Sequence, residues 1–235
     1  MNKLEKDFRN FAVNQRINGG YISGLAVDDY MKQINNSAWQ SPTIIEPTGS
    51  NFGVAIDVFS RMMKERIIFL SSEIDEYVGS IITSQMLYLN SQSETEGISM
   101  YINSPGGSVS AGLSIYDTMM YLDCPLVTVV TGTAASMASV LLAAGDQGQR
   151  FSQQHARVMI HQASTGVHGR MEDIKVTYEQ IQSLNDELFR IIAAHSHQPV
   201  EKIYEISQKS DCWLTAEQAK EFGIIDKILE PKKKI

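Results

Sequence analysis

Hydrophobic and polar positions alternate along this chain between short apolar runs and longer segments with apolar residues at helical spacing. Runs typical of buried strands occupy Thr43–Glu46, Arg66–Leu70, Ile98–Ile102, Leu126–Thr131, Arg157–Ile160 and Ile224–Ile228. Segments typical of helices occupy Val54–Met63, Val78–Leu89, Val109–Leu122, Val140–Ala144, Glu172–His195, Val200–Ser207 and a short stretch that ends at Gly223. Because strands and helices alternate, the sequence predicts an α/β fold of repeated βα units with a largely parallel sheet.

The longest helical segment, about residues 172–197, carries one apolar stripe. The stripe consists of Ile174, Tyr178, Ile181, Leu184, Leu188, Ile191 and Ile192. At about 1.5 Å per residue, such a helix reaches well beyond the small domain that precedes it. A protruding helix with an apolar stripe needs a partner to cover the stripe, so the pattern predicts self-association.

The first 41 residues differ from the rest of the chain. They are rich in Asn, contain the Gly19–Gly20 turn and lack the alternation of a buried strand. We therefore interpret residues 1–41 as an N-terminal extension outside the core.

Composition narrows the class of protein. The 235 residues are 43% hydrophobic and 20% charged, which is typical of a globular chain. A net charge of −7 argues against broad binding to nucleic acid. No apolar segment is long enough to cross a bilayer. Two cysteines make no disulfide framework, so we expect a cytoplasmic protein that binds neither nucleic acid nor membrane.

Residues suited to acyl-transfer chemistry follow three of the predicted strands. Gly106–Gly107 follows Ile98–Ile102, Ser136 follows Leu126–Thr131, and His161 follows Arg157–Ile160. The carboxyl ends of parallel strands meet at one edge of a sheet, where reacting groups collect. A serine needs a base with a pKa near neutrality, and a glycine turn can point backbone N–H groups at an oxyanion. Taken alone, the stretch around Ser136 favours an ordinary helix cap, because Ser is a common N-cap residue.

An orienting carboxylate for His161 cannot be chosen from spacing alone. Asp146, Asp173, Asp211 and Asp226 all remain candidates at this point. The pair His195 and His197 has the spacing of metal ligands, but no Cys or carboxylate cluster lies near it in the sequence. We interpret the pair as cations at a helix C-terminus and expect no metal site.

Four segments together resemble one protein family. They are Tyr101–Gly107 (YINSPGG), Ser114–Met119 (SIYDTM), Gly132–Ala138 (GTAASMA) and Arg157–Gln162 (RVMIHQ). Their order and spacing resemble those of ClpP, the proteolytic subunit family of ATP-dependent Clp proteases, over roughly Thr43 to Leu229. The resemblance implies a crotonase-like core in residues 61–229 and a handle helix at about 172–197. It also implies an axial segment at 42–60, a basic tail at 230–235 and a propeptide at 1–41.

The resemblance assigns roles by position. It implies that Ser136 is the nucleophile, His161 the base and Asp211 the orienting acid. The backbone N–H groups of Gly107 and Met137 would form the oxyanion hole. The implied activity is that of a serine endopeptidase that hydrolyses unfolded polypeptides through an acyl-enzyme.

The resemblance further implies a homo-oligomer of two stacked heptameric rings that receives substrates from a hexameric AAA+ unfoldase of the ClpX or ClpA/ClpC type. No P-loop motif occurs in the sequence, so ATP would be used by that partner and no cofactor is expected here.

The sequence departs from the family pattern at Ser210, where many members carry Arg. This difference puts the contacts between the two rings in question. The alternatives are a crotonase-type acyl-CoA enzyme and an inactive structural subunit of a mixed ring.

Overall fold

The computed structural model describes residues 42–47, 53–164, 168–207 and 210–232. The chain divides into two compact units, Met1–Val58 and Phe59–Ile235. The predicted extension at 1–41 and the end of the basic tail at 233–235 lie outside the described residues.

In the first unit, two strands form an antiparallel ribbon. β1 (Thr43–Pro47) pairs with β2 (Gly53–Asp57), with Thr43 opposite Asp57. The strand β1 confirms the prediction for this segment, but the helix predicted over Val54–Met63 is wrong in its first half. Residues 53–57 belong to β2, and only α3 (Val58–Lys64) is helical. A short apolar run does not distinguish strand from helix, and here pairing with β1 decides for the strand.

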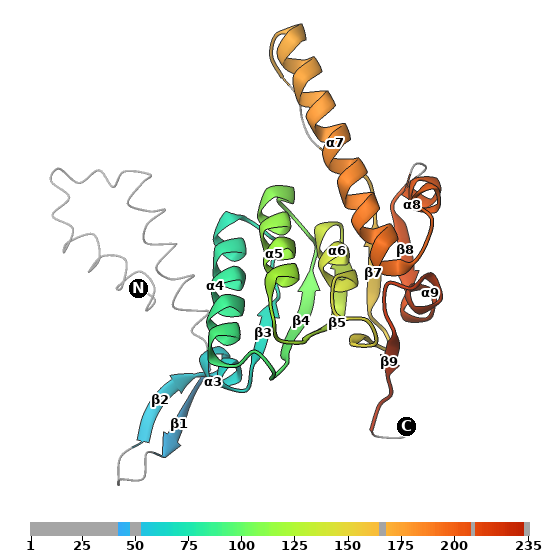
Figure 1. The fold of residues 1–235 in the computed structure, drawn as a ribbon. Helices are drawn as coiled ribbons and strands as arrows, with labels where there is room; N and C mark the ends of the chain where they lie inside the picture. The colour runs from blue at the N-terminus through green and yellow to red at the C-terminus, as the bar shows by residue number, and fades with distance from the viewer. Residues whose placement is uncertain (1–41, 48–52, 165–167, 208–209, 233–235) are drawn as a thin grey trace, which may run out of the picture. The chain divides into compact units, whose positions relative to one another are not determined.

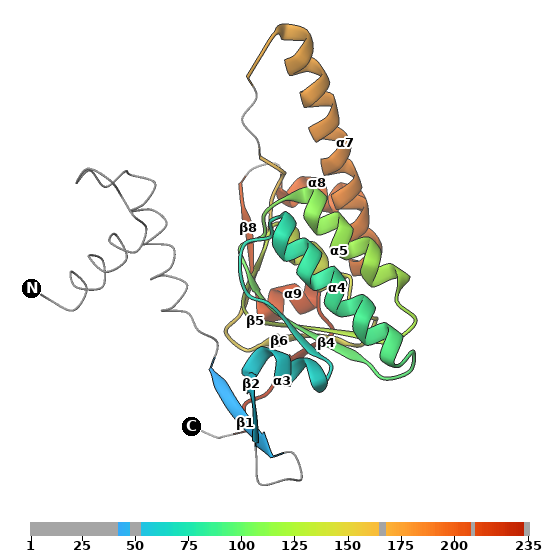
Figure 2. The ribbon, with the colours of Figure 1, turned by 90° about the vertical axis from the view of Figure 1, so that its left-hand side faces the viewer.

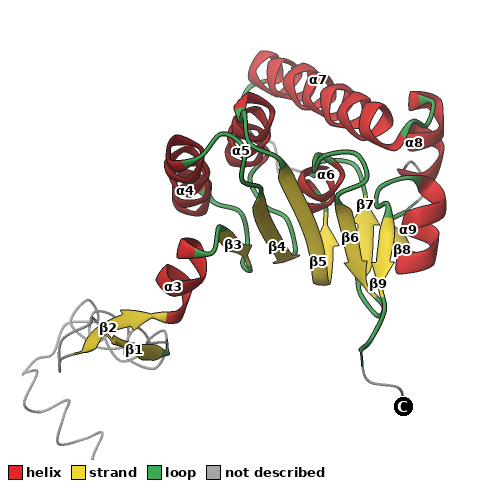
Figure 3. Ribbon diagram, turned by 60° about the horizontal axis from the view of Figure 1, so that its bottom comes forward, coloured by secondary structure: helices red, strands yellow, loops and turns green. Residues whose placement is uncertain are grey.

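The second unit is built on a seven-stranded sheet (Figures 1 and 3). Its strands are β3 (Ile67–Leu70), β4 (Ile98–Ser104), β5 (Leu126–Ala135), β6 (Arg150–Gln153), β7 (Arg157–Ile160), β8 (Cys212–Thr215) and β9 (Lys227–Leu229). The order is β3-β4-β5-β6-β9, with β7 paired to β5 and β8 paired to β7. All of these pairs are parallel except β7–β8, which confirms the predicted α/β fold with a largely parallel sheet.

Three predicted helices lie side by side on one face of the sheet (Figure 3). They are α4 (Glu76–Gln92), α5 (Val109–Tyr121) and α6 (Met137–Ala143). Between them and the sheet lies the hydrophobic core, which includes Ile68, Met100, Ile102, Ile115 and Leu141, each at most 1% exposed. The crossover helices thus place the ends of β4, β5 and β7 at one edge.

Strand β5 is long enough to pair with two different neighbours. Its first part, Thr128–Val130, pairs with β6, and its last part, Thr133–Ala135, pairs with β7. The sequence prediction ended this strand at Thr131 and missed β6 and β8. The continuation matters because it carries the chain directly to Ser136.

The helix α7 (Met171–Ser196) projects away from the sheet (Figures 1 and 2). Its 26 residues correspond to about 39 Å. Buried positions begin only at Leu188, while Tyr178 on the same stripe is 62% exposed. The predicted protruding helix is therefore confirmed. On its stripe Tyr178 is exposed and Ile174, Ile181, Leu184 and Ile191 are only partly buried in the single chain.

The C-terminal elements complete this unit. Helix α8 (Val200–Ser207) follows α7, and α9 (Ala216–Phe222) begins with the predicted capping box of Thr215 and Gln218. The last strand runs over 227–229 rather than the predicted 224–228, because the Ile224 and Ile225 N–H groups donate to the Ala219 carbonyl of α9 instead of to a strand. Within the described residues, no helix has the length and hydropathy needed to span a membrane.

Candidate active site

Ser136 lies at the turn between β5 and α6 in an unusual backbone conformation. Its φ is 54° and its ψ is −127°, and its side chain makes no capping hydrogen bond to α6. A non-glycine residue at positive φ is strained, and such strain is concentrated at functional sites. The interpretation of Ser136 as an ordinary helix cap is therefore wrong.

Strand register brings His161 to Ser136. Ala135 pairs with Met159, and the Ser136 N–H donates to the Met159 carbonyl at 2.9 Å. His161 follows two residues after Met159, and its Nε2 atom lies 2.8 Å from the Ser136 Oγ atom. A hydroxyl and an imidazole at this distance share a hydrogen bond suited to proton transfer.

Asp211 lies beside His161 because β7 and β8 pair antiparallel. Ile160 on β7 lies opposite Cys212 on β8, so the residue after Ile160 meets the residue before Cys212. The His161 Nδ1 atom and the Asp211 Oδ1 atom are 3.4 Å apart, with the two side chains 25% and 56% exposed. This distance is longer than a well-formed hydrogen bond but places the carboxylate on the ring nitrogen opposite Ser136.

The structure gives each of the four candidate aspartates a different partner. Asp146 accepts a hydrogen bond from the Leu126 N–H, and Asp173 pairs with Arg170 on the surface. Asp226 pairs with the buried Arg150 at 2.7 Å. Asp211 alone of the four contacts His161 in the described part of the chain, as the resemblance implied.

A glycine turn after β4 forms the other wall of the site. Gly106 and Gly107 have φ of 92° and 149°. A Cβ atom on Gly106 would lie 2.7 Å from the Ser136 Cβ, and one on Gly107 would lie 2.2 Å from the Ile74 carbonyl oxygen. No side chain fits at either position, so this turn can approach the serine only as glycine.

Two backbone N–H groups remain available beside Ser136. The bridge between Ile74 and Gly107 uses the Gly106 carbonyl and the Ser108 N–H, which leaves the Gly107 N–H out of this pairing. Met137 is the first residue of α6, so its N–H has no acceptor within the helix. Two such donors next to a nucleophile are the components of an oxyanion site.

The Met137 side chain fixes the start of α6. It is 2% exposed, and a Cβ atom on Gly112 of α5 would lie only 2.1 Å from its Cγ. The absence of a side chain at Gly112 therefore lets α6 begin at this depth in the core. Close packing between α5 and α6 holds the Met137 N–H in place.

A cleft of about 350 Å³ opens over these groups. It is lined by Glu73, Gly107, Ser136, His161 and Ala163, among others. A substrate carbonyl bound here would meet the serine, the imidazole and the glycine turn together. The cleft is thus large enough for a few residues of an extended peptide.

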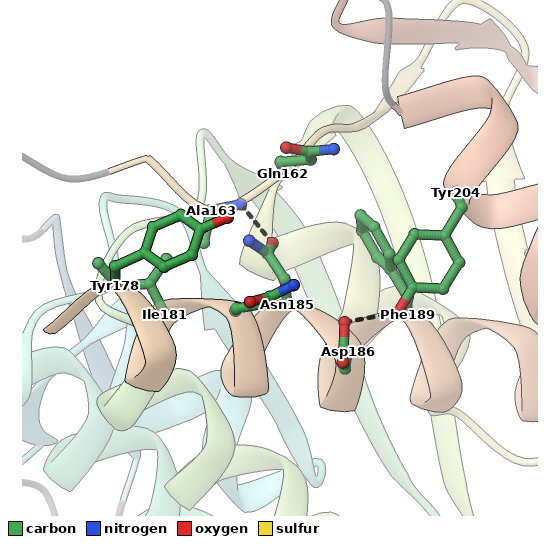
Figure 4. Close-up of a pocket in the computed structure, with 9 residues that line it drawn as sticks. Gln162, Ala163, Tyr178, Ile181, Asn185, Asp186, Phe189 and Tyr204 are labelled. Atoms are coloured by element: carbon green, nitrogen blue, oxygen red, sulfur yellow. Dashed lines mark hydrogen bonds between the residues drawn. The ribbon is translucent and has the colours of Figure 1, made fainter. Parts of the chain in front are cut away.

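A second cavity of about 350 Å³ lies between α7 and the segment that follows His161 (Figure 4). Asn185 of α7 accepts a hydrogen bond from the Ala163 N–H at 2.7 Å. At the other end of the cavity, Tyr204 donates to Asp186 at 2.5 Å. Ala163 lines both cavities, so α7 contacts the wall of the catalytic cleft through the hydrogen bond between Asn185 and Ala163.

The other histidines lie outside the site. His195 hydrogen bonds to the Tyr116 hydroxyl at 3.1 Å, and His197 to Gln147 at 3.3 Å. Burial and, to a smaller extent, the nearby Arg150 and His197 lower the pKa of His195, which disfavours the charged imidazole in the last turn of α7. Among the described residues, no group of three or more His, Cys, Asp or Glu side chains could hold a metal ion.

Sequence reasoning missed several residues that shape the site. Ser104 is buried, and its hydroxyl links the Ser72 carbonyl to the Gly106 N–H at 2.6 and 3.1 Å. Asn185 and Glu73 also escaped notice. Their polar side chains in mostly apolar or turn segments gave no periodic signal. Only the fold brings Glu73 to the catalytic cleft, Asn185 to the second cavity and Ser104 to the glycine turn.

An α/β protein with a strained serine, a histidine at hydrogen-bond distance and a glycine-lined turn belongs among the serine hydrolases. The comparisons with known proteins narrow the class. The family described as Clp protease matches residues 49–232. The ATP-dependent Clp protease proteolytic subunit of Porphyromonas gingivalis is 48% identical over 213 residues, or 91% of this chain and 94% of that protein.

A second relative carries the same name. The ATP-dependent Clp protease proteolytic subunit of Bacteroides thetaiotaomicron is 45% identical over 226 residues, or 96% of this chain and 99% of that protein. The chain therefore belongs to the Clp protease family, and it is a ClpP-type serine endopeptidase. Neither an acyl-CoA enzyme nor an inactive ring subunit finds support in these comparisons.

Proposed function

We propose that the chain cleaves peptide bonds through an acyl-enzyme formed on Ser136. The observation that carries this assignment is the 2.8 Å separation of the His161 Nε2 and Ser136 Oγ atoms. In this scheme His161 takes the hydroxyl proton as Ser136 attacks the carbonyl carbon, and then returns the proton to the leaving amine. Water hydrolyses the ester in a second step that uses the same base.

Asp211 has an orienting role in this proposal. It lies on the Nδ1 side of His161, where a carboxylate favours the tautomer that leaves Nε2 free to accept a proton. The same carboxylate stabilises the imidazolium that forms during attack.

The Gly107 and Met137 N–H groups serve as the oxyanion hole. Both flank Ser136, and both are free of the backbone pairings of the glycine turn and of α6. Fixed donors of this kind stabilise the charge that develops on the carbonyl oxygen, and removing one typically costs about 10²–10³ in rate.

The assembly and partners that we propose follow from family membership. The chain forms two stacked heptameric rings and receives unfolded polypeptides from a hexameric AAA+ unfoldase of the ClpX or ClpA/ClpC type, which uses the ATP. Exposed apolar side chains on α7 support self-association: Tyr178 of the stripe is 62% exposed and Val176, beside the stripe, is 66% exposed in the single chain. Residues 42–60 as an axial segment and the cytoplasm as location are part of the same proposal.

Covalent labelling tests the assigned nucleophile. The assembled wild-type protein should react with a fluorophosphonate at Ser136 and cleave a fluorogenic peptide, whereas Ser136→Ala should do neither while keeping the wild-type native mass. Ser91→Ala removes an exposed hydroxyl on α4 and should behave as wild type. Labelling or cleavage that survives in Ser136→Ala would overturn the assignment.

A further inference from the structure

Glu73 places a carboxylate on the rim of the catalytic cleft. It lines the same cavity as Ser136 and His161, on the side of the glycine turn. It is exposed to solvent rather than buried. A substrate bound in the cleft therefore lies close to the negative charge of Glu73.

The main chain around Glu73 is fixed to the glycine turn. The next residue, Ile74, is 1% exposed, donates its N–H to the Gly106 carbonyl at 2.8 Å and accepts from the Ser108 N–H at 2.7 Å. On the other side, the Ser104 hydroxyl binds the Ser72 carbonyl at 2.6 Å and accepts from the Gly106 N–H. Because both neighbours are tied to the turn, Glu73 keeps a constant place relative to the backbone donors beside Ser136.

The Glu73 carboxylate has no ion pair or hydrogen bond within the described residues. Neighbouring carboxylates are engaged: Asp75 caps α4 through the Val78 N–H, and Glu76 accepts from the Ser108 hydroxyl. In the adjacent cavity, Asp186 is bound by Tyr204. Glu73 is thus the carboxylate of this region that can still accept a cation from a substrate.

The described residues that line the cleft include no Lys or Arg. An anionic substrate side chain would therefore face Glu73 without compensation, and a cationic one would meet an unpaired partner. Like charges repel by about as much as opposite charges attract at a given distance.

We propose that Glu73 is a specificity-determining residue that favours substrates with Lys or Arg close to the scissile bond. This inference rests on the proposed function, because it requires the bond to be cleaved at Ser136. An exposed ion pair of this kind changes kcat/KM by about threefold. The effect is smaller at high salt, because the rim is open to solvent.

Matched peptides test the proposal on the assembled protease without any unfoldase. Each fluorogenic pair carries Lys or norleucine at one position within three residues on either side of the cleaved bond, since norleucine keeps most of the chain length without the charge. The ratio of the two kcat/KM values is measured for wild type, Glu73→Gln and Glu94→Gln. Glu94 lies beyond the far end of α4, so its substitution removes the same charge away from the cleft.

At one or more positions, wild type and Glu94→Gln should favour Lys by about threefold, and Glu73→Gln should bring the ratio close to one. The wild-type preference should shrink between 50 and 500 mM salt, which is about the range over which exposed pairs are screened. A ratio that Glu73→Gln leaves unchanged at every position would overturn the role of Glu73. Absence of cleavage by wild type on both peptides of each pair would instead contradict the proposed function.

Discussion

The backbone N–H of Ala163 donates a hydrogen bond to the Oδ1 atom of Asn185 at 2.7 Å. Ala163 lies two residues after His161, and Asn185 lies on α7 just before its buried part. The projecting helix is therefore fastened to the segment that carries the histidine (Figure 4). We therefore expect the position of α7 to affect the orientation of the His161 imidazole through this contact.

We predict that Asn185→Ala lowers kcat on a short peptide by about fivefold, which corresponds to about 1 kcal/mol for one hydrogen bond. KM should change less, because the contact positions His161 rather than binding substrate. The measurement is steady-state cleavage by the assembled protein. Asn185→Asp keeps the acceptor oxygen and should restore most of the activity, so equal impairment of both variants would contradict the positioning role.

The alternation of strand and helix was sufficient to predict the parallel sheet and its crossover helices. It failed where pairing is decided by distant segments. β6 (Arg150–Gln153) is short, and three of its four residues are polar. β8 pairs antiparallel with β7 across some 50 residues of chain. Neither strand has a periodic pattern of its own, so only the assembled sheet defines it.

The same limit applied to the site. Strand ends predicted that Gly107, Ser136 and His161 would meet, since each follows a parallel strand of one sheet. Asp211 precedes the antiparallel β8, and its proximity to His161 depends on the register that sets Ile160 opposite Cys212. Spacing therefore left four aspartates open, and only the family resemblance selected one of them.

Replacing the proposed orienting acid tests this register. Asp211→Asn should lower kcat by about 10²–10⁴, because an amide favours the wrong imidazole tautomer. The loss of kcat should be smaller than 10⁴, because Asp211 is 56% exposed and lies 3.4 Å from His161, so its interaction with the imidazole is weakened by solvent and distance. Asp146→Asn removes a carboxylate that contacts the Leu126 N–H and should leave kcat within about twofold of wild type. Equal effects of the two substitutions would remove Asp211 from the site.

A substitution at Gly112 tests whether the position of the Met137 backbone N–H, the proposed oxyanion donor, matters for catalysis. Gly112→Ala places a methyl group where the Met137 side chain lies, at 2.1 Å from its Cγ. Overpacking of this kind costs about 1–3 kcal/mol of stability. We expect kcat to fall by about tenfold, less than the 10²–10³ seen when an oxyanion donor is removed. Thermal unfolding and peptide cleavage should be measured together.

Gly97→Ala is the matched control for Gly112. A Cβ atom there meets its nearest neighbour at 3.4 Å, which is ordinary contact. Activity and stability should therefore stay near the wild-type values. If Gly112→Ala is destabilised but cleaves peptide at the wild-type rate, the start of α6 does not depend on this packing.

Residues 1–41 provide a prediction about maturation. If the extension is a propeptide removed by the protein's own active site, intact-mass measurements on the assembled wild type should show loss of about this segment. Ser136→Ala should keep its full-length mass under the same conditions. Identical full-length masses in the two proteins would reject self-processing, and identical shortened masses would assign the cleavage to another protease.

Arg150 and Asp226 form a buried ion pair away from the catalytic cleft. The Arg150 side chain is 4% exposed and that of Asp226 17%, with 2.7 Å between Nη2 and Oδ1. Arg150 also donates to the His195 carbonyl, which ties the end of α7 to β6. Asp226→Asn leaves the buried guanidinium uncompensated and should lower the free energy of unfolding by about 3 kcal/mol. Denaturant titration at a fixed protomer concentration measures this value.

The pH dependence of the stability difference between wild type and Asp226→Asn shows whether the charge of the Asp226 carboxylate causes it. Burial would raise the pKa of Asp226, but hydrogen bonds from the Arg150 side chain and from the Arg150 and Gly148 N–H groups outweigh it and hold the pKa below its usual range. The stabilisation is then complete above the unfolded-state pKa of about 3.9 and is lost as the pH falls through the lower folded-state pKa. The stability gap between wild type and Asp226→Asn should therefore stay constant from about pH 7 to 5 and narrow below about pH 4. Asp173→Asn breaks an exposed pair with Arg170 and should open a much smaller gap. A gap for Asp226→Asn that is equally small would mean that the buried pair adds nothing to the fold.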